Sequence, residues 1–287
     1  MKLTLTALSV LFFLSFGATE AIQAQTFLDR AVINSQSVET LGKRKLDFRV
    51  SHRFGDMFGT SGGWSTLYGL ENASDILIGF NYGVTDNFDI AINRTAGSGA
   101  LRRLINTTAK WKFLDQFGEQ PKAITMAFVF VGSVSSSESS GNPESIDNFE
   151  TFAHRIAYTS EFLIARKWNE VLSTQIIAGY QHRNVVFEND ENGIVFAGLA
   201  ARARLSKGFA LIFDGTFPFS SLRTAANSYY PALGLGVEFD TGGGHVFQIN
   251  LTNATGLSEN DFIPYTRSNW AEGEFRLGFT ISRKFRI

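Results

Sequence analysis

Charged side chains recur at every second position in several stretches that are otherwise apolar. Arg49 lies between Phe48 and Val50, for example. Arg202 and Arg204 alternate with alanine and leucine. A period of two residues is typical of a β-strand whose two faces meet different surroundings. The charged faces carry both signs: Arg49, Arg53, Lys110, Lys112, Arg155, Arg183, Arg202, Arg204 and Arg276, with Asp47, Glu161, Asp214, Glu238 and Glu274.

These charges allow two chemical interpretations. If they line an aqueous lumen, they form a filter that selects small polar solutes by charge and width. If they pair with one another, they form an ion-pair network that fills the lumen and conducts nothing, because buried charges are tolerated only when paired. Basic members outnumber acidic ones, which favours anions in any open pore.

Other chemistry finds less support in the sequence. The four histidines, His52, His154, His182 and His245, lie far apart without the spacing of metal ligands, so we expect no metal or cofactor. Cysteine is absent, which excludes disulfides and thiol catalysis. No GxSxG motif is present, so a lipid-acting serine hydrolase is only a third hypothesis after a channel and a closed barrel.

The element that best shows the strand pattern is the stretch 73–95, ASDILIGFNYGVTDNFDIAINRT. Two alternating runs flank a short Thr85-Asp86-Asn87 turn, which predicts a β-hairpin. The same pattern predicts ten further strands, at 45–53, 103–113, 122–134, 151–165, 171–183, 194–205, 209–217, 230–239, 245–253 and 273–285.

The connections between these strands alternate in length. Short ones, such as 206–208 and 240–244, alternate with longer ones, such as 220–229 and 254–272. Short periplasmic turns, long external loops and an even number of strands are typical of outer-membrane barrels. We therefore predict an all-β fold, an up-and-down antiparallel transmembrane β-barrel of about twelve strands, in which loop 54–72 or loop 254–272 forms a constriction.

Composition agrees with a barrel in lipid. The chain has 28 phenylalanines, 27 glycines and 5 prolines, and only 18% of its residues are charged, below the roughly 25% usual for soluble domains. Residues 1–24 resemble a secretory signal peptide, with Lys2, an apolar run and small residues before the cut. The barrel domain is then predicted to cover residues 25–287 and to begin with a short polar lead at 26–44, before the first strand.

Several short motifs resemble a known family: HRFGD at 52–56, ASDI at 73–76, YGVTD at 82–86, IARK at 164–167, HRN at 182–184 and ISRKF at 281–285. Together they are similar to an outer-membrane β-barrel family of Bacteroidota that carries only a domain-of-unknown-function label. The resemblance implies a barrel exported through the periplasm to the bacterial outer membrane. It implies no catalytic residues.

The sequence thus predicts a passive channel or transporter for small polar solutes. The alternative is a closed barrel that serves as a structural or docking protein for a periplasmic or surface partner. Contact with outer-membrane lipid is expected in both cases, and nothing in the charge pattern indicates nucleic acid.

Overall fold

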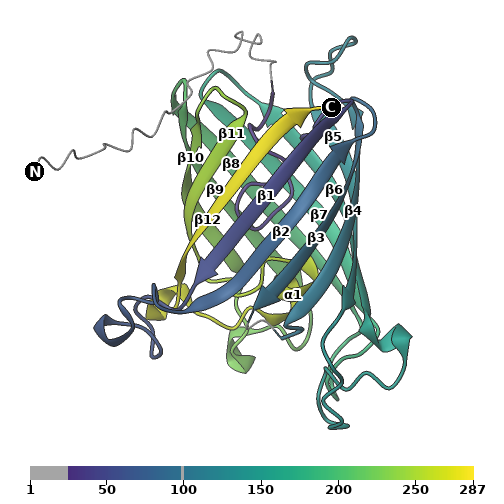
Figure 1. The fold of residues 1–287 in the computed structure, drawn as a ribbon, viewed down its shortest axis with the longest axis vertical. Helices are drawn as coiled ribbons and strands as arrows, with labels where there is room; N and C mark the ends of the chain where they lie inside the picture. Colours follow the sequence, from purple (N-terminus) through teal and green to yellow (C-terminus); the bar gives the residue numbers. More distant parts are fainter. Residues whose placement is uncertain (1–24, 98–99) are drawn as a thin grey trace, which may run out of the picture.

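Twelve strands close into one antiparallel barrel in the part of the chain that the computed structural model describes, residues 25–97 and 100–287 (Figure 1). The expected signal peptide, 1–24, lies outside the described residues. Each strand pairs with its neighbours in sequence, and β1 pairs with β12 to close the barrel. The strands are β1 (Lys45–Phe54), β2 (Ala73–Gly83), β3 (Phe88–Gly97), β4 (Arg103–Leu114), β5 (Thr125–Ser135), β6 (Ile156–Lys167), β7 (Leu172–Arg183), β8 (Gly193–Ser206), β9 (Phe209–Phe219), β10 (Ala232–Asp240), β11 (His245–Thr252) and β12 (Arg276–Arg286). The predicted fold class is confirmed.

The alternation in sequence becomes alternation in exposure. On β8, Ile194 and Phe196 point inward and are buried, whereas Val195 and Leu199 point outward and are exposed. The outer wall carries an apolar belt of exposed side chains that includes Ile78, Phe80, Ile90, Ile92, Phe130, Phe162, Ile176, Val195, Leu235 and Ile249.

The two ends of the barrel differ. The C-terminus and the start of the described chain lie at the end that carries the tight turns, here named the turn end (Figure 1). The long connections lie at the opposite end, the loop end, and hold the short helices η1 (Trp64–Thr66), η2 (Phe152–Arg155), η3 (Ala225–Asn227), α1 (Glu259–Tyr265) and η4 (Trp270–Glu272). No helix in the described ranges is long and apolar enough to span a membrane.

Two late strand starts displace predicted inner residues. β6 begins at Ile156 because η2 occupies residues 152–155, and β12 begins at Arg276, after a turn that follows η4. Arg155 and Glu274 were predicted on strands and lie instead in the connections at the loop end. The placement of these two side chains on the inner wall was therefore wrong.

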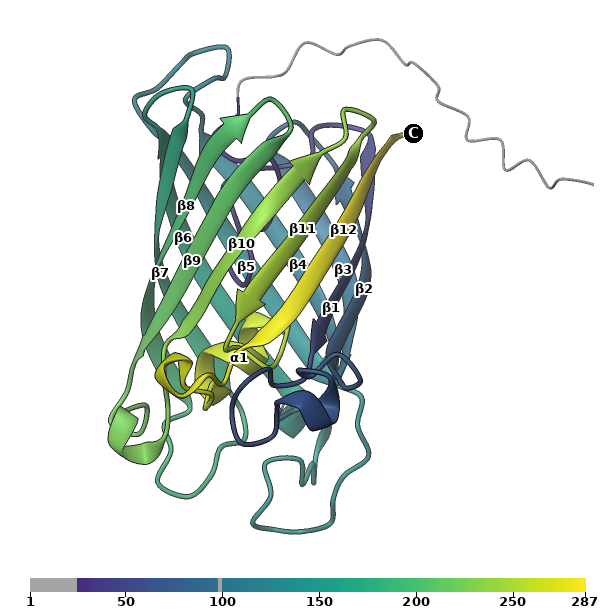
Figure 2. The ribbon, with the colours of Figure 1, turned by 90° about the vertical axis from the view of Figure 1, so that its left-hand side faces the viewer.

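The interior of the barrel is filled from both ends. Residues 26–41, here named the N-terminal segment, enter the lumen from the turn end and return to β1 (Figures 1 and 2). The connection from β11 to β12 enters from the loop end and places α1 across the lumen. An apolar core joins both to one side of the wall: Phe27, Val32, Ile33 and Val38 pack with Phe262 and Ile263 and with Ala127, Val129, Val131, Leu163, Ala165, Ile177, Phe196, Ala200, Ile212, Ala232 and Ala254.

Candidate functional site

The tip of the N-terminal segment is a tight turn around a wall carboxylate. The turn is closed by a hydrogen bond from Val32 N to Ser35 O (2.9 Å). Asp214 Oδ2 accepts the backbone N–H groups of Ile33 (3.1 Å), Asn34 (2.6 Å) and Ser35 (2.8 Å). Asp214 Oδ1 accepts Asn34 Nδ2 (2.8 Å). One buried carboxylate of β9 thus holds the whole tip, and four amide N–H groups of the segment stabilise it by hydrogen bonds.

A bidentate ion pair between Arg30 and Asp89 of β3 anchors the part of the segment that leads into the lumen. Arg30 donates Nε to Asp89 Oδ2 (2.9 Å) and Nη2 to Asp89 Oδ1 (2.5 Å). Its third contact runs from Nη1 to Asn81 Oδ1 (2.7 Å). Paired guanidinium and carboxylate groups of this geometry are among the stronger and more directional polar contacts in proteins.

A second ion pair joins the segment to β1. Arg49 Nη2 lies 2.6 Å from Asp29 Oδ1, and Asp29 is buried. Burial alone would raise the pKa of Asp29, but the charges of Arg49 and Lys284 outweigh it and lower this pKa below its ordinary value. Asp29 is therefore an anion at neutral pH, paired with a wall arginine.

Lys110 of β4 binds the main chain of the segment. Its Nζ donates to the carbonyl oxygens of Arg30 (2.8 Å), Ser37 (2.8 Å) and Glu39 (3.2 Å). An ammonium group has three donor hydrogens, so all of them are used on the segment. Lys110 therefore lines no open path while the segment is in place.

The obstruction at the loop end is fixed by the residues around α1. Asn260 accepts Thr159 Oγ1 (2.7 Å) and donates to Ser133 Oγ (2.7 Å). Leu257 N donates to Asp75 Oδ2 (2.8 Å). α1 thus lies across the lumen, hydrogen-bonded to β5 and β6, with β2 holding the chain just before it. Of the two loops predicted as constrictions, 254–272 enters the lumen and 54–72 does not.

Asp261 of α1 is a buried carboxyl in this obstruction. Its Oδ1 accepts Ala100 N (3.1 Å). Burial, together with the nearby charge of Asp75, raises the pKa of Asp261 to about 7. Deprotonation of this carboxyl would place an additional negative charge in the buried surroundings of α1.

The two obstructions contact each other inside the lumen. Gln36 Nε2 of the N-terminal segment donates to Glu259 Oε1 of α1 (2.7 Å). Arg53 of β1 contacts both, through Nη2 to Asn34 Oδ1 (2.6 Å) and through Nη1 to Gly256 O. The segment, α1 and the wall are thus one connected network.

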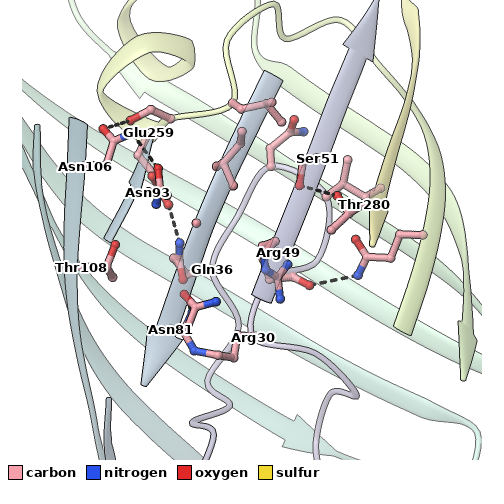
Figure 3. Close-up of a pocket in the computed structure, with 18 residues that line it drawn as sticks. Arg30, Gln36, Arg49, Ser51, Asn81, Asn93, Asn106, Thr108, Glu259 and Thr280 are labelled. Atoms are coloured by element: carbon pink, nitrogen blue, oxygen red, sulfur yellow. Dashed lines mark hydrogen bonds between the residues drawn. The ribbon is translucent and has the colours of Figure 1, made fainter. Parts of the chain in front are cut away.

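A small polar cavity remains beside this junction (Figure 3). Its volume is about 70 Å³, room for only a few water molecules. It is bordered by side chains of β1 to β4, β11 and β12 and by both obstructions, and the labelled lining residues are Arg30, Gln36, Arg49, Ser51, Asn81, Asn93, Asn106, Thr108, Glu259 and Thr280. The lumen therefore has a polar side with residual space and an apolar side that is fully packed.

Most of the other predicted lumen charges pair within the wall or near its ends. Arg202 Nε contacts Glu238 Oε1 (2.7 Å), and Arg204 contacts Glu170 (3.1 Å). The remaining contacts are those of Lys112 with Asp115 (2.7 Å), Arg183 with Asp190 (3.0 Å) and Arg276 Nη1 with Asn253 O (2.6 Å). Glu161 is buried in the lumen wall.

The two misplaced residues have structural contacts at the loop end. Arg155 donates to the carbonyl oxygens of Ser135 (3.2 Å) and Ser137 (2.5 Å), and its guanidinium lies over the Phe149 ring. Glu274 accepts the backbone N–H of Asn269 (2.8 Å). Both residues therefore hold loops in shape.

The histidines do not form a site. His52 stacks on Phe279, and His182 stacks on Tyr158, both on the outer surface. In the residues that the structure describes, no group of three or more histidine, aspartate or glutamate side chains could hold a metal ion.

Sequence reasoning missed the N-terminal segment, which it treated as a polar lead. The available signal was apolar: Val129 and Val131 alternate with outward-facing phenylalanines on β5, so this strand is apolar on both faces. An inner wall that meets only water would not be apolar. Such a strand predicts that another segment of chain packs inside the barrel.

The closed twelve-strand fold agrees with the family that the sequence matches. Residues 27–285 match the family described as "Membrane bound beta barrel domain (DUF5777)". The chain belongs to this family. The DUF5777 match covers all twelve strands and nearly all of the N-terminal segment, and it confirms the resemblance to a membrane barrel family of unknown function. The Bacteroidota origin stays a prediction. A comparison with curated proteins finds no match.

Solved barrels resemble this DUF5777 protein only distantly. The NanC porin is 8% identical with a TM-score of 0.48, over 84% of this chain and 100% of that chain. A KdgM porin in complex with disordered oligogalacturonate is 6% identical with a TM-score of 0.49, over 85% and 99%. An outer membrane channel from Pseudomonas putida F1 is 13% identical with a TM-score of 0.48, over 86% and 98%. At such identities and scores the likeness is limited to the barrel.

Proposed function

We propose that this barrel is a channel for small polar solutes in the bacterial outer membrane, and that its own N-terminal segment closes it. The observation that carries the proposal is that residues 26–41 fill the lumen through contacts concentrated on a few wall side chains: Lys110, Asp89, Asp214 and Arg49. The channel opens when the segment leaves the lumen toward the turn end, which faces the periplasm.

The geometry favours a movable segment over a permanent filler. Among the described residues no strand precedes the segment, so it can leave without breaking any pair of wall strands. Its contacts with the polar side of the wall are hydrogen bonds and ion pairs, which water can replace. The cavity of about 70 Å³ on this side is also lined by polar side chains of the wall, such as Ser51, Asn81 and Asn106.

When the segment leaves, the polar side along β1 to β4 and β12 is the route that we expect solutes to take beside α1. Wall charges of both signs line it, which suits small polar solutes. Anion preference is tested by reversal potential in Arg49→Ala, because Arg49 of β1 lines this polar side and loses its partner Asp29 when the segment leaves.

The decisive experiment compares the full chain with a variant lacking residues 26–41 in planar lipid bilayers. We expect the full chain to be mostly closed and the deletion variant to conduct steadily. Strand content by circular dichroism and heat-dependent gel migration establish that both barrels fold. A folded deletion variant that stays silent would overturn the proposal.

Silence of the folded deletion variant would favour the closed-barrel alternative. In that alternative the N-terminal segment is a permanent part of the barrel core, held there by the apolar packing of residues such as Phe27 and Val38. Loops at the barrel ends would then serve as a docking surface for a periplasmic or surface partner.

A further inference from the structure

The connection 55–72 between β1 and β2 exposes an unusual amount of apolar surface. Phe58 is 56% exposed and Trp64 is 77% exposed. Three more large apolar residues in this loop are also exposed: Leu67, Tyr68 and Leu70. Soluble protein surfaces rarely gather so many apolar side chains in one place without a partner.

The loop has a defined shape. Gly55 N donates to Gly69 O (3.0 Å), which closes the loop at its base. Met57 N donates to Phe275 O (2.8 Å), and Phe58 N donates to Gly273 O (3.2 Å), which fasten it to the chain before β12. The apolar side chains are thus presented by an ordered scaffold.

The aromatic rings form a continuous row of tilted and edge-on contacts. The centroid of the Phe58 ring lies 5.7 Å from that of Phe275 and 5.3 Å from that of Tyr68. The Tyr68 ring lies 6.3 Å from that of Trp64. The row leads from the barrel wall outward to the most exposed tryptophan.

The position of the loop identifies what it meets. Figures 1 and 2 show it, in dark blue, projecting sideways from the loop end of β1 and β2, beside the wall and away from the mouth. On β2 the apolar belt is exposed at Ile78 and Phe80. The loop surface is therefore continuous with the surface that faces lipid in a membrane-bound barrel.

The charge of the loop agrees with this position. Residues 54–72 contain no lysine or arginine, and the two acids, Asp56 and Glu71, lie near its ends. Tryptophan and tyrosine favour the boundary between lipid and water, where the ring is apolar and one edge is wet.

We propose that loop 55–72 lies on the membrane surface at the loop end and inserts Trp64, Leu67 and Leu70 into the interfacial region of the lipid. The partner is a lipid surface, and the contact anchors one side of the barrel. This inference rests on the membrane-bound barrel and is independent of whether the channel opens.

The test uses Trp64 as the only fluorescent reporter in the full chain. Trp111, Trp168 and Trp270 are replaced by phenylalanine, and the protein is reconstituted in phosphatidylcholine vesicles with or without brominated acyl chains. We expect blue-shifted Trp64 emission that brominated lipid quenches and that dissolved iodide does not. A matched control adds Glu144→Trp to a variant with Trp64→Phe, because Glu144 lies at the exposed far end of another loop.

The control tryptophan should behave in the opposite way, with red-shifted emission that iodide quenches. If Trp64 behaves like this control, the loop points into water and the proposal is wrong. If the Trp64 emission shifts only at high protein-to-lipid ratio, the occupant is a second copy of the chain, and the proposal is also wrong.

Discussion

Asp214→Asn is the sharpest single change to the proposed closure. The substitution keeps the size of the side chain but removes its charge and one of its two acceptor atoms. In the native chain these two oxygens accept four hydrogen bonds from the N-terminal segment, three of them from backbone N–H groups of the tip. The NH₂ group of the asparagine would then face at least one N–H group of the segment, so that hydrogen bond would be lost.

The expected loss can be worked from these contacts. Hydrogen bonds to a charged group contribute about 1.5–3 kcal/mol each. If the change removes the equivalent of two such bonds at the lower value, the docked state of the segment loses about 3 kcal/mol. Since about 1.4 kcal/mol corresponds to a factor of ten, the ratio of open to closed barrels rises about 100-fold.

The assay is the fraction of time that single molecules conduct in planar bilayers. The matched control is Asp240→Asn, the same substitution at the last residue of β10, where the side chain accepts a hydrogen bond from Gly242 N in the following turn and does not contact the segment. We expect frequent opening in Asp214→Asn and native behaviour in the control. A folded Asp214→Asn barrel that conducts no more than the control would refute the reasoning that this carboxylate holds the channel shut.

Three further predictions concern the two obstructions. Thr26 Oγ1 and Thr125 Oγ1 lie 3.3 Å apart, and the chain has no cysteine, so Thr26→Cys with Thr125→Cys should form a disulfide that abolishes opening until a reductant is added, seen as conductance. Burial raises the pKa of Asp261 to about 7 from 3.8, so the docking of α1 is favoured at low pH and this contribution is lost as pH rises through 7. Hydrogen exchange of α1 should therefore quicken between pH 5 and 8 beyond the intrinsic rate, and Asp261→Asn should remove this excess. Val38→Ala empties a fully buried site and should weaken segment docking by about 1–2 kcal/mol, raising the open fraction about tenfold, whereas the half-exposed Val84→Ala should not.

The barrel itself could be predicted from the sequence because strand periodicity is local. On β8 the inward set that includes Ala200 and Arg202 and the outward set that includes Leu199 follow directly from alternation. The starts of β6 and β12 could not be predicted in the same way, since the residues of η2 and of the turn after η4 also fit the alternating strand pattern.

The closure of the lumen depends on contacts that local pattern does not encode. Nothing near residues 33–35 in sequence marks Asp214 as their partner, because 179 to 181 residues separate them. Lys110 was predicted on the inner face, and its three acceptors belong to a segment that looked like a polar lead. The filter role of the predicted lumen charges stays a prediction.

The distant partners of the N-terminal segment also set an order of assembly. The segment is synthesised before all twelve strands, yet it contacts Asp214, Gln248 and Lys284, the last of them 256 residues further along the chain than its partner Leu28. These contacts cannot form before β12 has been made and has reached β1. Insertion of the segment is therefore a late event that requires a closed cylinder, and a barrel with an open seam would leave these first residues accessible to proteases.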